Sequence, residues 1–426
     1  MQSAVPEPDF ELAARLFDTL AQKTHDTVGI TRASYGEGEQ FAHDLIAQTG
    51  RLAGLATTTD VAGNLYVTLN GRDPAKGTFL IASHLDSVPQ GGNFDGAAGV
   101  IAGIAILTSW KRAGFEPPGD VAVMAIRAEE STWFPYSYIG SKAAFGVLPK
   151  TALDIVRADT GRTLAQHMAE LGFDPNAVAR GEAHCTRDRI RGYVELHIEQ
   201  GPVLVGRDIP LALVTGIRGS FRYRDARILG EYGHSGAVPR AYRHDSVVAA
   251  ADFVTRLNLE WERLESEGQD LTITIGKLFT DPAQHAFSKI AGEVGICIDV
   301  RSHSKLTLAT VQALVDRLSA EMSEKHGVRF DLGPLTGSEP AEMDRDLLAR
   351  FSTAAAELNI PHIHMPSGAG HDAAVFAAAG VPAVMLFVRN QNGSHNPDEA
   401  MRMDDFELAA RVIARAVAGL SWVPRH

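Results

Sequence analysis

An apolar stretch, "TFLIAS" (78–83), runs directly into a polar, glycine-rich segment, "HLDSVPQGGNFDGAAG" (84–99). A short apolar run that stops at such a segment is typical of a buried strand. Residues 98–114 are apolar on most faces and end at a glycine, which predicts a helix packed on a sheet. Two more apolar stretches, 119–131 and 192–201, predict further strands. The sequence therefore predicts an α/β fold with a mostly parallel central sheet and helices on both faces.

The hydrophobic pattern changes after about residue 210. Two predicted helices, 246–268 and 305–327, now alternate with stretches in which every second residue is apolar. The resulting order β-α-β-β-α-β is typical of a ferredoxin-like α+β unit. A fully apolar stretch at 380–388 then returns to the earlier pattern. We therefore expect an inserted domain at 214–333 within a larger domain made of residues 1–213 and 334–426.

Composition excludes several classes of protein. The formal charge of −12 and the lack of a Lys/Arg cluster argue against nucleic acid as a partner. The roughly 18 uninterrupted apolar residues of a membrane span do not occur. The first 20 residues lack the features of a signal peptide, so we expect a cytoplasmic protein without a membrane partner. With only two cysteines in the chain, any metal would be held by His, Asp and Glu.

Polar side chains that suit a metal stand at the ends of the predicted strands. Sites in open parallel sheets form beyond the carboxyl ends of the strands. A single strand-end histidine is more often packed or solvated than a ligand, and a Glu-Glu pair is usually a surface feature. Imidazoles combined with carboxylates are, however, the ligands of dinuclear zinc or manganese centres. Five segments supply such residues, which are His84, Asp86, Asp95, Glu129, Glu130, His197 and His395.

The glycines around Asp95 suit the same interpretation. They allow a sharp turn and a close approach of the backbone, and the helix that begins near Ala98 directs free N–H groups to the same region. A flexible surface turn would explain the glycines as well, but it would not explain His84 and Asp86 beside them. The loop is therefore predicted to direct a carboxylate into a site.

Six motifs in this order resemble the hydantoinase/carbamoylase branch of the dinuclear-metal aminoacylase and carboxypeptidase superfamily. They are "SHLDSVPQGGNFDGAAGV", "EES", "ELHIEQGPVL", "GHSG", "SGAGHDA" and "GSHNPDE", and the resemblance spans about residues 75–405. That branch includes N-carbamoyl-L-amino acid amidohydrolases, β-ureidopropionases and allantoate amidohydrolases. The resemblance implies two divalent ions per subunit, Zn²⁺ first, with Mn²⁺, Co²⁺ and Ni²⁺ as alternatives. It also implies that the inserted domain is a lid through which a homodimer forms.

The resemblance further implies the ligands of the two ions. One ion would be held by His84, Asp95 and His197, and the other by the same Asp95 together with Glu130 and His395. Asp95 would therefore bridge the two ions.

Three catalytic roles follow from the same resemblance. Asp86 would accept the second ring N–H of His84 and fix its tautomer. Glu129 would be the general base that activates a metal-bridging water and then protonates the departing nitrogen. His234, in "GEYGHSGAVPR", would stabilise the oxyanion from its own subunit or across the dimer.

The positions that would contact the substrate include departures from the family. Arg301 would bind the substrate carboxylate, and Gln200 and the backbone near Gly370 would make further contacts. Ser288 stands where the family commonly has Asn, and Trp133 replaces a typical Arg of the "EES" region. Arg389 and Asn390 replace a common Pro and Ser before the last ligand. Four other residues receive no ligand role, namely His362 and His364, which are read as strand residues near the site, and the supporting pair His371 and Asp372.

These features predict a metal-dependent amidohydrolase that cleaves a linear C–N bond in a small anionic substrate. The favoured substrate is an N-carbamoyl-L-amino acid or a related ureido acid. An N-acyl-L-amino acid amidase or a dipeptidase would use the same centre with a different pocket. A protein that binds a small anionic ligand without turnover is the alternative from another class, although binding alone needs no base such as Glu129.

Overall fold

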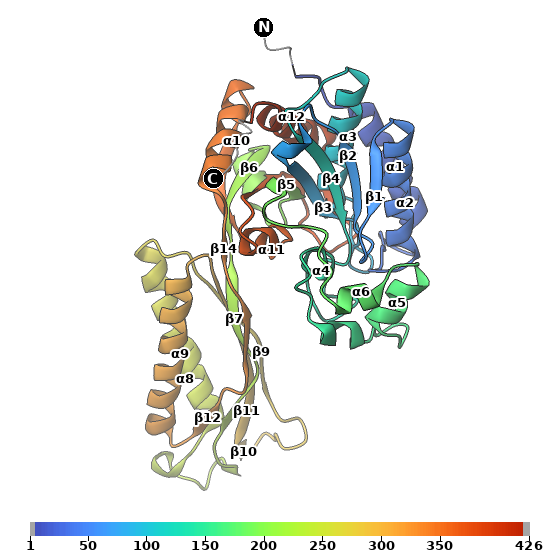
Figure 1. Ribbon diagram of the computed structural model, residues 1–426. Coiled ribbons are helices and arrows are strands. Elements are labelled where there is room, and N and C mark those ends of the chain that lie inside the picture. The colour runs from blue at the N-terminus through green and yellow to red at the C-terminus, as the bar shows by residue number, and fades with distance from the viewer. Residues whose placement is uncertain (1–4, 421–426) are drawn as a thin grey trace. The chain divides into compact units, whose positions relative to one another are not determined.

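The computed structural model of the protein describes residues 5–420 (Figure 1). Residues 1–4 and 421–426, which belong to the larger expected domain, lie outside the described residues. The chain forms two compact units. The second unit comprises Gly216–Glu342 and Pro366–Gly370, and the first unit comprises the remainder. The second unit continues beyond the expected end at 333 because β13 (Leu335–Ser338) still pairs with β7 (Gly219–Leu229).

The first unit is organised around a mixed sheet with a parallel centre. The central strands are, in spatial order, β4 (Asp120–Ile126), β3 (Thr78–His84), β5 (Ile190–Ile198) and β16 (Ala383–Val388), and neighbours in this set are parallel. The predicted α/β class with a mostly parallel central sheet is confirmed. Antiparallel strands, which the sequence analysis did not predict, extend the sheet at both sides. They are β1 (Ala56–Thr59) and β2 (Leu65–Leu69) next to β4, and β6 (Leu211–Ile217) next to β16. Strand β15 (His362–Ser367), which contains the two histidines read as strand residues, also pairs with β6. The short strand β14 (Ala341–Glu342) pairs antiparallel with Gly216 and Ile217 of β6, all within the second unit.

Helices cover both faces of this sheet. On one face, α3 (Ala97–Arg112) packs on β3, β4 and β5 and is buried from Ala97 to Trp110, which explains why it is apolar all round. It shares a core with α1 (Phe10–Thr24), α2 (Glu37–Leu52), α10 (Arg345–Glu357) and α12 (Met403–Ala418) (Figure 1). On the other face, α11 (Ala373–Ala378) stacks the ring of Phe376 on that of Tyr193 at 3.9 Å. Because side chains alternate along a strand, the residues next to Tyr193 on β5 face the opposite layer of helices.

The remaining elements of the first unit are short. They are the helices α4 (Ile139–Ala144), α5 (Leu164–Glu170), α6 (Pro175–Ala179) and α7 (Val203–Arg207), the 3₁₀ turns η1 (Pro74–Lys76) and η2 (Lys150–Asp154), and the paired strands β17 (Asn390–Gln391) and β18 (Ala400–Met401). Helices α4 to α6 have a small apolar core of their own. Within residues 5–420, no helix combines the length and the apolar character that crossing a bilayer requires.

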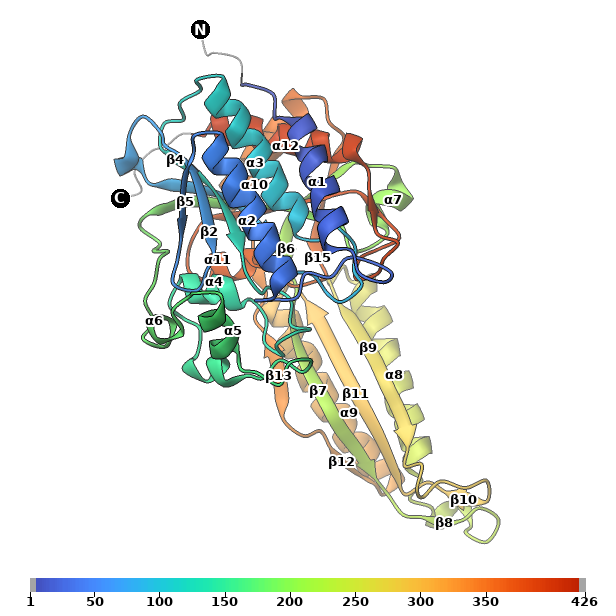
Figure 2. The ribbon, with the colours of Figure 1, turned by 90° about the vertical axis from the view of Figure 1, so that its right-hand side faces the viewer.

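The second unit has the ferredoxin-like order predicted from the alternating pattern. Its elements are β7, α8 (Ser246–Ser266), β9 (Thr272–Thr280), β11 (Glu293–Ser302), α9 (Lys305–His326) and β12 (Arg329–Asp331), and its sheet is antiparallel in the order β12-β7-β11-β9. Both helices lie against one face of the sheet (Figure 2). Every second residue of β11 is buried beneath them, so its other residues, Arg301 among them, lie on the open face. The short strands β8 (Gly233–His234) and β10 (Lys289–Ile290) pair, and η3 (Arg240–Tyr242) follows β8.

Candidate metal centre

Three of the parallel strands end where the candidate ligands begin. His84 is the last residue of β3, His197 lies near the end of β5, and Glu129 and Glu130 follow the end of β4. Because these strands are parallel, their carboxyl ends meet at one edge of the sheet. The loop that carries Asp95 follows β3 and lies at the same edge.

Two histidines and one carboxylate form the first ligand group. The Nε2 atoms of His84 and His197 lie 3.3 and 3.0 Å from Oδ1 of Asp95, and 3.4 Å from each other. All three side chains are buried. Three ligand atoms therefore converge on one point, in the set that the family resemblance implies.

The second ligand group shares Asp95. Nε2 of His395 lies 3.7 Å from Oδ2 of Asp95 and 3.2 Å from Oε1 of Glu130. His395 has a φ of +60°, in the left-handed region, and its side chain is half exposed, unlike the buried acids. One carboxylate can thus contribute one oxygen to each group, as a bridging ligand does.

The chemistry of these side chains fits a divalent cation. In the described part of the chain, no Lys or Arg forms an ion pair with Asp95, Glu129 or Glu130. Oδ1 of Asp95 is buried and accepts no well-directed hydrogen bond from residues 5–420. A mixed set of imidazole nitrogens and carboxylate oxygens suits Zn²⁺, Mn²⁺, Co²⁺ or Ni²⁺.

Within the chain, protons on the neighbouring histidines can balance the negative charge of these acids. Burial opposes a charge on His84, but the neighbouring Asp86 and Asp95 outweigh burial and raise the pKa of the imidazole well above its usual value. Burial would raise the pKa of Asp95, yet His197 and His84 lower it well below its usual value. A divalent cation would displace these protons and take over their electrostatic role.

Asp86 connects His84 to both glutamates. Nδ1 of His84 lies 3.1 Å from the carbonyl oxygen of Asp86 and 3.3 Å from its Oδ1. The two oxygens of the Asp86 carboxylate accept the backbone N–H groups of Glu129 and Glu130, at 3.1 and 3.2 Å, and the Ser34 hydroxyl at 2.6 Å. The contact of Asp86 with His84 was expected from the family resemblance, whereas its contacts with Ser34 and with the two backbone N–H groups were not. Asp86 therefore orients one ligand and the pair of acids together.

Glu129 has the properties of a group that can hold a proton. Burial raises the pKa of its carboxyl well above the usual value, although His84 opposes the shift, and the nearby Glu130, Asp372 and Asp86 raise the pKa further. A buried carboxyl whose pKa is raised in this way is suited to accept and release a proton.

A glycine next to Asp95 permits the close packing of the first ligand group. Gly96 has a φ of +65°, which favours glycine, and a Cβ there would lie 2.5 Å from ring atoms of His84. Helix α3 begins directly afterwards, at Ala97. The glycines were expected to bring the backbone close to the site. At Gly96, the backbone lies close to the ring of His84.

Other residues of the first unit support the centre. Nε2 of Gln200, which was expected to contact substrate, donates to Oδ2 of Asp95 at 3.0 Å and lies 3.4 Å from Nε2 of His395. The ring of His371 packs edge-on against that of His197 at 4.5 Å. Asp372 is buried and accepts a hydrogen bond from Ser141.

The remaining predicted substrate contacts lie in the second unit. His234 is exposed on β8, and its Nδ1 accepts the backbone N–H groups of Gly236 and Ala237 at 3.1 and 3.2 Å. In a neutral imidazole the proton is then on Nε2, which can donate a hydrogen bond. Ser288 is exposed, and its carbonyl oxygen accepts the N–H of Ser235.

Arg301 is held by its own strand. Its guanidinium donates to the Asp299 carboxylate, with Nη2 2.9 Å from Oδ2, and Nη1 donates to the carbonyl oxygen of Gly368 at 3.0 Å. Residues 299 and 301 share the open face of β11 because side chains alternate along a strand. Gly370 lies in the same short segment as Gly368, within the second unit.

The residues that depart from the family are mostly engaged with other parts of the first unit. Trp133 is half buried, and its Nε1 donates to the carbonyl oxygen of Ser87 at 2.7 Å. Arg389 donates to both oxygens of Asp405, and Asn390 is buried and donates to the carbonyl oxygen of Gly393, so both shape the loop that leads to His395. His362 and His364, which received no ligand role, lie on β15 and belong to neither ligand group.

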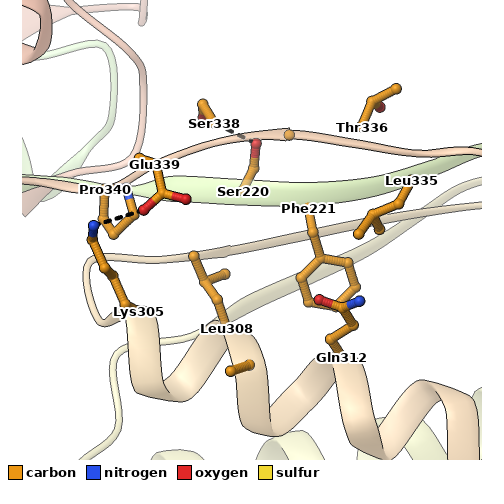
Figure 3. A pocket seen from close by; sticks show the side chains of 12 residues that line it. Ser220, Phe221, Lys305, Leu308, Gln312, Leu335, Thr336, Ser338, Glu339 and Pro340 are labelled. Atoms are coloured by element: carbon orange, nitrogen blue, oxygen red, sulfur yellow. Dashed lines mark hydrogen bonds and ion pairs between the residues drawn. The ribbon is translucent and has the colours of Figure 1, made fainter.

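A pocket of about 410 Å³ lies away from all these residues, between α9 and β13 of the second unit (Figure 3). Lys305 and Glu339 line it and pair at 2.8 Å, so each neutralises the other. Phe221 and Leu308 contribute apolar side chains to its lining. None of the predicted site residues lines this pocket.

Comparisons with known proteins agree with the resemblance. The chain matches Peptidase family M20/M25/M40 over residues 80–419. It is 33% identical to an N-carbamoyl-L-amino acid amidohydrolase of Geobacillus stearothermophilus, over 91% of this chain and 93% of that protein. It is 30% identical to an allantoate amidohydrolase of Escherichia coli strain K12, over 92% and 93%. A solved hydantoinase/carbamoylase family amidase of Burkholderia multivorans has a TM-score of 0.85 and 25% identity, over 96% and 97%.

Proposed function

This chain belongs to Peptidase family M20/M25/M40, and we propose that it hydrolyses the ureido group of an N-carbamoyl-L-amino acid or of a related ureido acid such as allantoate. Its relatives make it a hydrolase of carbon–nitrogen bonds other than peptide bonds, and the resemblance given by the six motifs is confirmed. The observation that carries the proposal is the position of Asp95 in two ligand groups, with the buried Glu129 adjoining one of their members, Glu130.

The first unit is proposed as the metal-binding catalytic domain. His84, Asp95 and His197 would hold one divalent ion, and Asp95, Glu130 and His395 the other. Such ions, Zn²⁺ first and Mn²⁺, Co²⁺ or Ni²⁺ as alternatives, would supply Lewis acidity and lower the pKa of a water molecule.

Glu129 moves the proton in the proposed reaction. It takes a proton from the water that attacks the ureido carbonyl carbon and passes it to the nitrogen that leaves with the amino acid. The C–N bond to the amino acid breaks, and the carbamate that remains decomposes to ammonia and carbon dioxide. Asp86 keeps Glu129 in place through the hydrogen bond to its backbone N–H.

Substrate recognition is assigned to both units. Arg301 binds the substrate carboxylate, because its guanidinium is always charged and is oriented by Asp299. Gln200, Ser288 and the backbone at Gly370 make further contacts. His234 donates from Nε2 to the oxyanion, which agrees with the tautomer that its Nδ1 contacts favour.

A homodimer through the second unit completes the proposal. Strand β9 lies at the edge of its sheet and pairs with β11 alone among the described strands. Leu278 and Phe279 on this strand are 51% and 55% exposed. An open edge that carries apolar side chains is a template for pairing with another chain, and we assign a second copy of this protein to it.

The experiment that tests the proposed function compares the products of several substrates. Metal-loaded protein is incubated with N-carbamoyl-L- and D-amino acids, with allantoate, and with N-acetyl-L-amino acids and dipeptides, and ammonia and free amine are measured. We expect ammonia from a ureido substrate, none after chelation, and much slower release in Glu129→Gln. Amine from acyl substrates or dipeptides without ammonia from ureido ones would assign the chain to the acylase or dipeptidase class. A metal-loaded protein inert on every substrate would favour a binding protein.

A further inference from the structure

The main chain at Asp95 is held by an acid from a distant part of the sequence. Oε1 of Glu399 accepts the backbone N–H of Phe94 at 2.8 Å and that of Asp95 at 3.2 Å. Glu399 is buried. Two hydrogen bonds to one carboxylate fix the orientation of consecutive peptide groups directly at the shared ligand.

Glu399 also closes the loop that carries His395. The loop begins after β17 and ends before β18, and these two strands pair with each other. Inside it, Asn392 donates to the carbonyl oxygen of Asp398 at 2.6 Å, and Asn396 donates to the carbonyl oxygens of Asn392 and Ser394. The loop is therefore held by its own hydrogen bonds, and its last residue, Glu399, reaches the loop of Asp95.

The surroundings of the Glu399 carboxylate are shaped to receive it. Gly92 has no side chain, and a Cβ there would lie 2.2 Å from Cδ and 2.3 Å from Oε1 of Glu399. The buried Arg32 donates to the carbonyl oxygen of Leu85 and to Asn93, in the same loop as Asp95. Burial lowers the pKa of Arg32, and the charge of Glu399 is the strongest of the acidic influences that oppose this shift. Burial and the neighbouring Asp95 raise the pKa of Glu399 to about 7. What holds the carboxyl group here is therefore the space that Gly92 leaves and the two backbone N–H groups it accepts.

We propose that Glu399 is a positioning residue that ties the Asp95 loop to the His395 loop and so sets the spacing of the second ligand group. The proposal rests on the metal centre of the proposed function. His84 and His197 stand on strands of the central sheet, whereas His395 stands on a loop. Loss of the Glu399 contacts therefore weakens the group of Asp95, Glu130 and His395 more than the group of His84, Asp95 and His197.

The test measures metal affinity with the full-length protein. Zn²⁺ or Mn²⁺ is titrated in competition with a chromogenic chelator, and two binding steps are resolved. Removal of a group that orients metal ligands costs about 10–100-fold in affinity, so we expect Glu399→Ala to lose this much at one step and far less at the other. Glu399→Gln retains an oxygen that can accept both N–H groups and is expected to restore most of the loss.

Two further variants separate positioning from folding. Gly92→Ala displaces the Glu399 carboxylate without removing it, and it is expected to weaken the same binding step. Asp120→Ala is the matched control, because Asp120 begins β4 at the other end of the strand and its carboxylate accepts the N–H of Gly71 at 2.9 Å. It should leave both binding steps unchanged. Thermal unfolding is recorded for every variant.

The outcomes distinguish this role from the proposed function. Two unchanged steps in both Glu399→Ala and Gly92→Ala would overturn the role of Glu399 and leave the metal centre intact. Equal loss at both steps together with a large drop in thermal stability would also overturn it, because Glu399 would then merely support the fold. An unaltered protein that binds no divalent ion would overturn the proposed function, and the role of Glu399 with it.

Discussion

The carboxyl edge of the first unit's sheet and the sheet of the second unit differ in how their acidic side chains are paired. At the carboxyl edge of the first unit, Asp95, Glu129 and Glu130 lie buried, and no Lys or Arg of the described chain pairs with them. On the second unit, the comparable acids are matched within the chain. Arg218 binds both oxygens of Asp270, with Nε 2.9 Å from each.

The open sheet face of the second unit repeats this matching. Asp299 lies between two cations, with Oδ2 2.9 Å from Nη2 of Arg301 and Oδ1 3.3 Å from Nε of Arg222. On the same sheet, Leu278 and Phe279 of the edge strand β9 are exposed apolar side chains. Unmatched negative charge attracts a cation, whereas unmatched apolar surface at a strand edge attracts another chain. The proposed function uses this difference, because it assigns divalent cations to the first region and a second copy of the chain to the other.

The largest expected effect comes from removing the shared acid of the first unit. Asp95→Asn takes away the carboxylate that is proposed to bridge the two ions, so we expect activity to fall to background. Added divalent metal should not restore it, although metal should restore the chelated unaltered enzyme. Bound metal per subunit and the rate of ammonia release are the measurements. Full activity of Asp95→Asn would show that the unmatched acids do not serve a metal.

Asp270→Asn is the matched substitution in the second unit. It leaves Arg218 without its partner, so we expect a loss of about 1–3 kcal/mol in the free energy of unfolding and unchanged metal content. Burial would raise the pKa of Asp270, but Arg218 and His303 outweigh burial and lower the pKa below its usual value. In the unfolded chain the pKa of an Asp is about 4, and Asp270 contributes its full stabilisation above this pH. The contribution is lost as the pH falls through the lower pKa that Asp270 has in the folded state. Denaturant unfolding between pH 2 and pH 7 measures this loss, which the variant should lack.

The next prediction distinguishes a carboxylate that binds metal from one that transfers a proton. We expect Glu129→Gln to lower kcat by about 10²–10⁴-fold, because the amide cannot accept the proton. Metal content should remain unchanged, since Glu129 belongs to neither ligand group. Metal analysis and steady-state kinetics on the same preparation check both statements. A metal-replete variant that keeps most of its activity would remove Glu129 from the mechanism.

A smaller effect concerns the two cations beside Asp299. If Arg301 binds the substrate carboxylate, Arg301→Lys loses a bidentate contact and should raise KM about tenfold. Arg222→Lys alters the other partner of the same aspartate and should leave KM unchanged. Equal changes in KM for the two variants would mean that Arg301 only balances Asp299, as Arg222 does.

The last prediction leaves the acids of the first unit untouched. The double substitution Leu278→Lys and Phe279→Lys puts charge on the open edge of β9. We expect this variant to sediment as a monomer at micromolar concentration. Leu335→Lys is the control, because Leu335 is similarly exposed on β13, at the opposite edge of the sheet. Unchanged mass of the double variant would place any dimer contact elsewhere.

Local patterns were enough to predict most of this architecture. The apolar run before His84 gave the strand β3, and the alternation over 292–302 predicted β11 with one buried face. Strand β6, in contrast, was missed. Its apolar residues could pair in either direction, and only contact with β16 makes it antiparallel.

The sequence likewise predicted some parts of the candidate site and not others. The ligand groups were expected from the family resemblance, and the motifs that carry it are short and continuous. The contact of Glu399 with the N–H of Asp95 joins residues 304 positions apart, and no local pattern encodes such a pair. The Arg301–Asp299 pair could have been predicted, because residues two apart on a strand share a face.

The interruption of the first unit by the second also has a consequence for biosynthesis. A ribosome makes His84, Asp95 and His197 before it starts the second unit, and it makes His395 only after that unit is finished. Nascent chains fold from the N-terminal side. One set of ligands can therefore be present on the growing polypeptide, while the other exists only when translation is almost over.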